Sequence, residues 1–247
     1  MEDWLTFYFC GMSKPFRFKQ FSVADDRCTH KVGTDAVLLG SWVQVSENDR
    51  RFLDIGTGSG VIALMLAQRS HTDARIEAIE IGRIETEQAE QNVRQSPWPE
   101  KVVVHNIALQ DFKSEGKFDL IVSNPPYFER SLLPPDPERI RARHTHQLSF
   151  DELLEGVVRL MLPRGRVAVV LPFERMTDFS QRALAQKLFP NRITHFRTRK
   201  HKAVERVLAE FKFEKTSTKE SELILYSDGE AWSEEYRNLT RDFYLKS

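Results

Sequence analysis

Two short segments carry residue types that could do chemistry together. The first is DIGTGSG at residues 54–60, where three glycines follow an acidic side chain. The second is NPPY at residues 124–127, where two prolines stand between an amide and an aromatic ring. Glycines let backbone N–H groups approach a ligand closely, and prolines end a strand and fix the backbone around them. The first segment suggests a ligand loop. The second is either a rigid strand exit or a clamp for something flat and polar.

The glycine loop favours a nucleoside cofactor. Its spacing, G-x-G-x-G, differs from the dinucleotide fingerprint G-x-G-x-x-G. It fits a loop around the amino-acid end of S-adenosylmethionine, with Asp54 accepting a hydrogen bond from the ammonium group. Glu80 lies near the end of the next predicted strand, where the ribose hydroxyls of a bound nucleoside would lie. The alternative is a turn that starts a helix and binds nothing.

The elements around these segments alternate, which predicts a parallel, doubly wound α/β sheet. Strands are predicted at 51–55, 75–81, 102–104, 118–123 and 166–171, and helices at 61–69, 84–95, 150–162 and 176–188. Strands at 192–198 and 206–213 have only a short basic linker between them and are therefore expected to pair antiparallel. A polar linker at 214–221, a strand at 222–226 and a helix at 232–244 follow.

The chain resembles class I S-adenosylmethionine-dependent methyltransferases of the amino-methylating kind, because DIGTGSG, Glu80 and NPPY occur in this order. More narrowly, it resembles the valine-tRNA adenine-37 N6-methyltransferases over nearly its whole length. The motifs that carry this resemblance are KVGTDAVLLGSW at 31–42, ARH at 142–144, KAVERVLAEF at 202–211 and the terminal LTRDFYLKS. The resemblance implies a Rossmann-like sheet of seven strands, mostly parallel, with an antiparallel last hairpin.

We expect one methyltransferase domain at 49–247. Residues 1–48 are expected to be an N-terminal extension whose helix, at 34–43, packs on the cofactor site. The implied activity is methylation of the N6 amine of adenine in tRNA, at adenosine 37 of valine tRNA, with S-adenosylmethionine as the cofactor and tRNA as the partner.

For that activity, NPPY would hold a planar exocyclic amine in line with the donor methyl group. The side-chain oxygen of Asn124 and the carbonyl of Pro125 would accept hydrogen bonds from the amine and stabilise the positive charge that grows on its nitrogen. The proline pair, Pro125 and Pro126, would keep that carbonyl in a fixed direction. Tyr127 would stack on the base, and Phe128 would form a second aromatic wall. NPPY can therefore be both a strand stop and an amine clamp.

The expected cofactor contacts come from several parts of the chain. By the resemblance, the segment before the N-terminal helix covers the methionine end of the cofactor, although Thr34 and Asp35 can equally be a helix cap. Methyltransferases of this type often have an Asp after the third strand, and here His105 and Asn106 stand there. Asn106 or a backbone group is therefore the expected adenine contact. The full set is Lys31, Gly33, Thr34, Asp35, Asp54, Gly56, Thr57, Gly58, Gly60, Glu80, Asn106 and Asn124.

Basic side chains gather in three segments, although 36 Lys and Arg balance 36 Asp and Glu. These segments are 14–31, 139–146 and 192–206. Each by itself can be a solvated face, but together they favour a surface that faces a polyanion. The expected RNA contacts, besides Phe128, are Arg139, Arg141 and Arg143 in a long loop at 129–149, and Arg197, Arg199, Lys200 and Lys202 at a hairpin tip.

Other features exclude several classes of protein. No apolar segment is long enough to span a bilayer, and the acidic start MEDWLTFYFC is not a signal peptide, so we expect a cytoplasmic protein with no membrane partner. Cys10 and Cys28 do not make a disulfide framework. His144 and His146 have no third ligand nearby, so no metal is expected. We expect the protein to be a monomer.

Three other functions remain open. A protein glutamine N5-methyltransferase also needs a planar nitrogen, but the basic segment at 192–202 favours RNA. A DNA adenine methyltransferase is disfavoured because no large target-recognition insert is apparent. A noncatalytic RNA-binding module would not need to retain Asp54, Gly56, Gly58, Asn124 and Tyr127.

Overall fold

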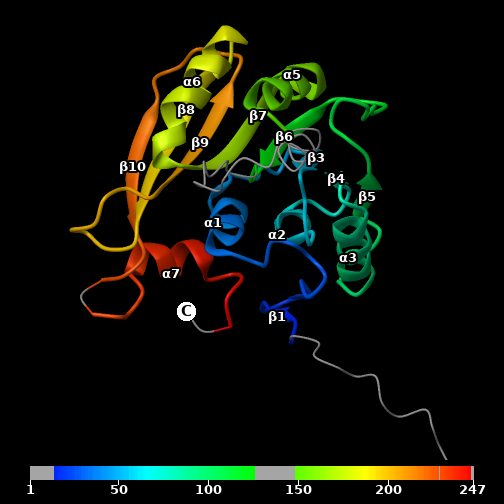
Figure 1. The fold of residues 1–247 in the computed structure, drawn as a ribbon, viewed down its shortest axis with the longest axis horizontal. Helices are drawn as coiled ribbons and strands as arrows, with labels where there is room; N and C mark the ends of the chain where they lie inside the picture. Colours follow the sequence, from blue (N-terminus) through cyan, green and yellow to red (C-terminus); the bar gives the residue numbers. More distant parts are fainter. Residues whose placement is uncertain (1–13, 126–147, 228, 246–247) are drawn as a thin grey trace, which may run out of the picture.

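The structure is a computed structural model that describes residues 14–125, 148–227 and 229–245. In these residues, eight strands form one mixed sheet. The strand order is β10-β8-β9-β7-β6-β3-β4-β5 (Figure 1). The strands are β3 (Arg51–Ile55), β4 (Arg75–Glu80), β5 (Val102–Asn106), β6 (Phe118–Ser123), β7 (Met161–Pro172), β8 (Phe189–Arg197), β9 (Arg206–Lys212) and β10 (Lys219–Ile224). A small antiparallel ladder, β1 (Phe16–Arg17) with β2 (Ser22–Val23), lies outside this sheet.

Helices cover both faces of the sheet because successive strand residues point to opposite faces. In β6, Leu120 and Val122 belong to one buried cluster and Ile121 to the other. The first cluster includes residues of α1 (Thr34–Trp42), α2 (Val61–Arg69), α3 (Arg83–Arg94) and α7 (Glu234–Thr240). The second includes residues of α5 (Phe150–Leu160) and α6 (Met176–Ala185), which follows the short 3₁₀ helix η1 (Phe173–Arg175). Among the described residues, no helix is both long and apolar enough to cross a bilayer.

The direction of the strands places the site. The strands from β5 to β7 pair in parallel, β9 pairs antiparallel with both β7 and β8, and β10 pairs in parallel with β8. Every strand of the sheet except β9 therefore ends at the same edge. The chain moves from β3 outward through β4 to β5 and then returns to β6 on the other side of β3. Ligands of open α/β sheets bind at such a switch point, beyond the carboxyl ends of the strands.

The predicted α/β class with its antiparallel hairpin is confirmed, but the sheet has eight strands, one more than the seven that the resemblance implies. β10 spans Lys219–Ile224, so it begins three residues before the strand predicted at 222–226, inside the stretch predicted as a polar linker, and ends two residues earlier. Its first four side chains are exposed, and charged side chains are common on an edge strand because they discourage pairing with other chains. The exposed first residues of β10 thus hid where the strand begins. β7 begins at Met161 rather than at 166, because α5 ends at Leu160.

Candidate functional site

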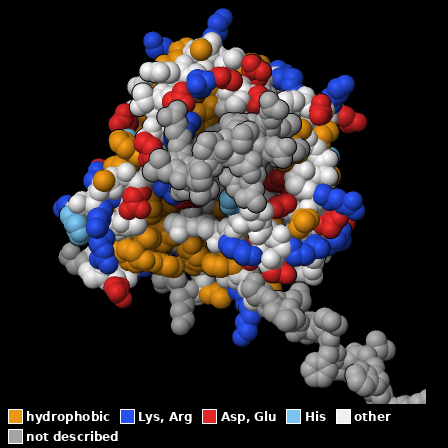
Figure 2. All heavy atoms as spheres, viewed as in Figure 1, with side chains coloured by type: hydrophobic (Ala, Val, Ile, Leu, Met, Phe, Trp, Pro, Cys, Tyr) orange, Lys and Arg blue, Asp and Glu red, His pale blue; other side chains and the backbone are white. Residues whose placement is uncertain are grey.

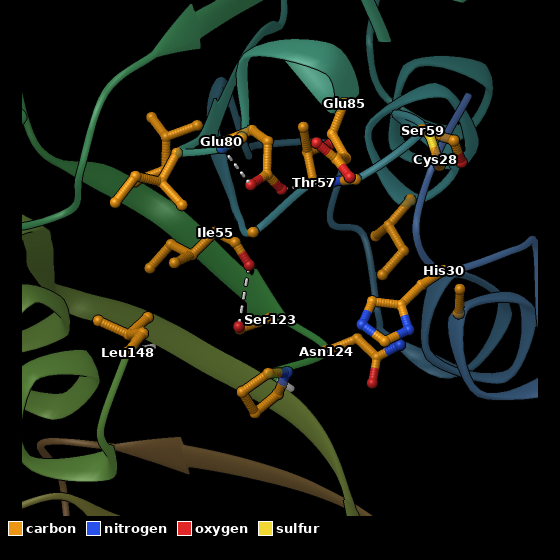
Figure 3. A pocket seen from close by; sticks show the side chains of 18 of the residues that line it. Cys28, His30, Ile55, Thr57, Ser59, Glu80, Glu85, Ser123, Asn124 and Leu148 are labelled. Atoms are coloured by element: carbon orange, nitrogen blue, oxygen red, sulfur yellow. Dashed lines mark hydrogen bonds between the residues drawn. The ribbon is translucent and has the colours of Figure 1, made fainter. Parts of the chain in front are cut away.

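A cavity of about 930 Å³ opens at the carboxyl ends of β3, β4 and β6 (Figure 3). Four loops or strand ends of the sheet line it, at residues 55–59, 79–82, 107–111 and 123–125. The segment 28–36, which leads into α1, forms a further part of the wall, and Glu85, Leu148, Glu152 and Arg206 are among the other residues that line the cavity. The cavity therefore joins the glycine loop, the end of β4 and the first half of NPPY, as the positions of these motifs at strand ends predict.

The glycine loop turns its bare backbone towards the cavity. Gly56 and Gly58 have φ values of +70° and +55°, in the left-handed region that favours glycine. The backbone N–H of Gly56 donates to the carbonyl of Ile79 at 2.9 Å, which ties the loop to β4. A Cβ added to Gly56 or to Gly58 would meet no atom within 4 Å, although both residues line the cavity. The space next to both residues is thus open to a ligand.

Gly60 has a different reason to be glycine. Its φ is +82°, and an added Cβ would lie 3.4 Å from the Cβ of Ala89 in α3. Gly60 lies outside the cavity wall that the described residues form. The structure therefore assigns Gly60 to close packing between α2 and α3, whereas the sequence placed it with the cofactor contacts.

Asp54 lies beneath the loop rather than in the cavity wall. Its side chain is fully buried, and its Oδ2 accepts hydrogen bonds from Thr57 Oγ1 at 2.6 Å and from the backbone N–H of Ala63 at 3.1 Å. Thr57 itself lines the cavity. Asp54 thus holds the turn together and stabilises the start of α2. Its other carboxylate oxygen, Oδ1, is buried and has no hydrogen-bond partner among the described residues, so the predicted contact with a cofactor ammonium group stays a prediction.

Burial makes Asp54 sensitive to pH. Burial raises the pKa of Asp54 from 3.8 to about 7, although its hydrogen bonds from Thr57 and Ala63 lower it. A raised folded-state pKa means that the folded chain binds this proton more tightly than the unfolded chain does. The stabilisation from Asp54 is therefore complete below about pH 4 and is lost as the pH rises through about 7.

We expect Asp54→Asn to remove this pH dependence, because the amide keeps an acceptor oxygen but does not ionise. Urea unfolding between about pH 4 and pH 8 should show the native protein losing stability relative to the variant as the pH rises. Parallel stability profiles of the two proteins would contradict the role given to burial.

Glu80 supports the loop and also faces the cavity. Its Oε2 accepts from the backbone N–H of Gly58 at 3.0 Å, and its Oε1 accepts from that of Gly82 at 2.9 Å. Each carboxylate oxygen has a second lone pair, so Glu80 keeps the capacity to accept from hydroxyl groups in the cavity. This position fits the predicted ribose contact, which remains a prediction.

Asn106 braces the end of β4 from outside the cavity wall that the described residues form. Its Nδ2 donates to the carbonyls of Glu80 and Ile81, both at 3.0 Å. The Asn106 side chain is therefore bound to the end of β4, and the expected adenine contact, Asn106 or a backbone group, stays a prediction. The wall beside Glu80 consists instead of Ile81, which is 49% exposed, and of residues 107–111. An exposed isoleucine carries no sequence signal by itself, and for that reason the sequence did not identify it.

The segment before α1 forms the wall opposite the sheet. Thr34 and Asp35 line the cavity, and the N-cap of α1 is Gly33, which makes no side-chain capping bond. Neither Thr34 nor Asp35 is therefore the N-cap of α1, and the helix-cap alternative for these two residues is wrong. Asp35 Oδ2 accepts from Arg206 Nε at 2.8 Å, so the start of α1 is joined to the start of β9.

Neighbouring residues hold this segment in place. Lys31, which also lines the cavity, donates from Nζ to the carbonyl of Asp25 at 2.6 Å. The hydroxyl of Thr29 donates to Glu85 in α3 at 2.8 Å. Cys28 is a free, buried thiol in the same wall, and burial raises its pKa to about 11, so the thiol stays neutral.

Asn124 and Pro125 reach the cavity from the end of β6 (Figure 3). The hydroxyl of the preceding Ser123 donates to the carbonyl of Ile55 at 2.9 Å and so fixes β6 against β3. The amide of NPPY and the glycine loop therefore share one space. His30 lines the same cavity, a position that no sequence spacing indicated.

The comparisons with known proteins agree with this geometry. The pattern of the methyltransferase small domain family matches residues 28–133. A curated relative from Bacteroides fragilis, named tRNA1(Val) (adenine(37)-N6)-methyltransferase, is 44% identical in an alignment of 242 positions that covers 95% of this chain and 100% of the relative. A relative of the same name from Aeromonas salmonicida is 42% identical over 96% of this chain and 99% of its own. The chain belongs to the family of tRNA1(Val) (adenine(37)-N6)-methyltransferases.

The fold of the chain is that of class I methyltransferases. A crystal structure of a predicted O-methyltransferase from Agrobacterium tumefaciens superposes with a TM-score of 0.67 and 16% identity, over 85% of this chain and 96% of that one. At this identity the likeness concerns the fold alone. The family resemblance and fold class expected from the sequence are both confirmed.

The predicted basic hairpin tip lies at the edge of the sheet that carries the cavity. It is the loop between β8 and β9, drawn in gold at the left of Figure 1, and Figure 2 shows Lys and Arg side chains gathered there. Arg197 pairs with Glu222 at 2.6 Å, and the Arg199 guanidinium lies 5.1 Å from the centre of the Tyr226 ring. Lys200 and Lys202 are exposed. The two arginines thus hold the loop, and the two lysines face solvent.

Several predicted residues lie outside the described residues. They are Pro126, Tyr127, Phe128, Arg139, Arg141 and Arg143, whose roles stay predictions. Within the ranges that the structure does describe, no group of three or more His, Cys, Asp or Glu residues is arranged to hold a metal ion.

Proposed function

We propose that this protein transfers a methyl group from S-adenosylmethionine to the N6 amine of adenosine 37 in valine tRNA. The observation that carries the proposal is that the open glycine backbone and Asn124 face one cavity. Membership of the family supports the choice of substrate, because the relatives are named for this reaction.

The residues of the cavity fit the cofactor. The bare backbone at Gly56 and Gly58 leaves room for a ligand, and the Glu80 carboxylate can accept from ribose hydroxyls. Exposed Ile81 offers an apolar surface for the adenine ring. Thr34 and Asp35, across the cavity, are placed for the methionine end. When bound there, S-adenosylmethionine supplies a methyl group attached to positively charged sulfur.

Asn124 and Pro125 act on the acceptor amine. Two carbonyl oxygens that accept from its N–H groups draw the nitrogen lone pair out of the ring and stabilise the positive charge that develops on nitrogen. The hydrogen bond from Ser123 to Ile55 holds β6 in register, so both acceptors are oriented before substrate arrives. The proton that leaves the methylated amine goes to water, since an arylammonium group is acidic.

The decisive experiment is methyl transfer from labelled cofactor to bulk tRNA, followed by mass analysis of the nucleosides. We expect N6-methyladenosine, located at position 37 of valine tRNA by fragment analysis. Absence of this nucleoside would overturn the proposal. Label on a glutamine-containing protein substrate, with none on tRNA, would favour the glutamine N5 alternative. We further propose that the protein acts in the cytoplasm and that it is a monomer. Light scattering of the purified protein tests the monomeric state.

Charge reversal at the basic loop should weaken tRNA binding. We expect the double variant Lys200→Glu with Lys202→Glu to raise the Kd for tRNA and to make that Kd less dependent on salt. The slope of log K against log salt should become shallower by about 0.7–0.9 for each phosphate that the variant no longer neutralises. Binding titrations at several salt concentrations measure both effects. Lys113→Glu with Lys117→Glu is the matched control, because these exposed lysines precede β6 and lie away from the cavity edge. Equal slopes for the two double variants would contradict binding of phosphate at this loop.

A further inference from the structure

Phe173 is an exposed aromatic side chain at the edge of the sheet that carries the cavity. It follows Pro172, the last residue of β7, and 48% of its surface is exposed. Among the large, exposed apolar side chains of the described residues, it is the one aromatic ring. Single exposed apolar side chains are common and need no function, so a role for this ring has to follow from its surroundings.

Phe173 lies beyond the end of β7, the strand that pairs with the one carrying Asn124. β6 pairs with β7, and Ser123 lies opposite Val169. If the strand spacing of about 3.3 Å per residue and about 4.8 Å between strands is continued to Phe173, its Cα atom lies about 11 Å from that of Asn124. Neighbouring bases in a stacked strand lie only about 3.4 Å apart. A base on Phe173 would therefore be a second base, separated from the target base, as in an RNA loop whose bases are turned out.

The surroundings of Phe173 fix its orientation. The ring meets His195 edge-on, with centroids 6.2 Å apart and an interplanar angle of 63°. The backbone N–H of Phe173 donates to the carbonyl of Glu205 at 3.2 Å, at the end of the basic loop. The next residue, Arg206, lines the cavity and binds Asp35. One continuous edge thus runs from the cavity past Phe173 to Lys202 and Lys200.

We propose that Phe173 stacks on an unpaired nucleotide next to the target adenosine, while Lys202 and Lys200 attract the phosphates of that part of the RNA loop. This inference rests on the tRNA substrate proposed above. Stacking on aromatic rings is a general way to hold unpaired bases, and it requires no particular base. Lysines near the ring add attraction for the backbone without reading sequence.

Steady-state methylation of valine tRNA tests this role. We expect Phe173→Ala to raise the KM for tRNA about 10- to 100-fold, with kcat and the Kd for S-adenosylmethionine nearly unchanged. Phe173→Trp should retain the native KM because it keeps a stacking ring. Phe173→Leu should behave like Phe173→Ala. Leu184→Ala is the control, because Leu184 in α6 is also 48% exposed.

A second arm identifies the partner of the ring. Valine tRNA with an abasic site at one flanking position should raise the KM of the native protein, but not further raise that of Phe173→Ala, because both changes remove the same contact. A native KM for tRNA in Phe173→Ala or in Phe173→Leu would overturn the stacking role. The role would also be overturned if Phe173→Ala and the abasic site raised KM additively at both flanking positions. Native protein that makes no N6-methyladenosine in the same assay would instead overturn the proposed function itself.

Discussion

Asn124→Ala should lower the rate of methyl transfer at least about 100-fold, while the cofactor still binds with native affinity. Asn124 offers one of two acceptors for the target amine, at the end of β6 in the wall of the cavity. Removing one oriented hydrogen-bonding group at a developing charge costs about 10²–10³ in kcat. The charge develops only as the new bond to nitrogen forms, so the loss belongs to kcat rather than to the Kd for the cofactor.

Single-turnover transfer from labelled cofactor and calorimetric binding of the cofactor measure the two quantities separately. Asn48→Ala is the matched control, because Asn48 is exposed in the segment before β3, outside the cavity wall that the described residues form. We expect the native rate from this control. A rate within about threefold of native for Asn124→Ala, with the variant folded, would refute the role given to NPPY.

Gly58→Val should lower the affinity for S-adenosylmethionine roughly 10- to 100-fold, which corresponds to the ~1–3 kcal/mol that added atoms cost in a filled space. The added Cβ would meet no protein atom within 4 Å, so the new side chain occupies space that is open in the free protein and that the ligand needs. The φ of +55° adds backbone strain, which acts on folding as well as on binding.

Strain and occlusion can be separated with a control glycine. Gly229 also has a positive φ, +85°, and an added Cβ there also meets nothing within 4 Å, but it lies in the turn before α7 rather than in the cavity wall. Gly229→Val should therefore lose similar stability in urea unfolding and keep native cofactor affinity. If both variants lost cofactor affinity equally, or neither did, the loop would not approach the cofactor as proposed.

Most elements that position the site could be predicted from local sequence. β3, α2 and β6 have the predicted bounds, because each is a short apolar segment between clear turn residues. The start of β10 was the main error in the sheet: a strand was predicted at 222–226, but the exposed residues at 219–221 have no apolar pattern that would show where it begins. Its place beside β8 depends on pairing between distant segments.

The roles of neighbouring motif residues could not be separated in the same way. Gly58 and Gly60 look alike in DIGTGSG, yet one lines the cavity and the other packs on Ala89 of α3. Asp54 is acidic and precedes the loop, yet burial turns its carboxylate towards Thr57 and Ala63. Whether a loop residue faces the cavity or a neighbouring helix depends on helices that come from elsewhere in the chain. The local spacing of residues does not show how those helices pack.

The sequence by itself therefore determined the α/β class, the strand ends that carry Gly58, Glu80 and Asn124, and the family to which the chain belongs. These depend on local periodicity, turn chemistry and short motifs. Only the tertiary structure decided that Asn106 braces a strand, that Arg197 and Arg199 hold their loop while two lysines face solvent, and that Phe173 stands beside the cavity edge. Such roles arise from contacts between segments that the sheet brings together, and a single aromatic or basic residue has no pattern of its own.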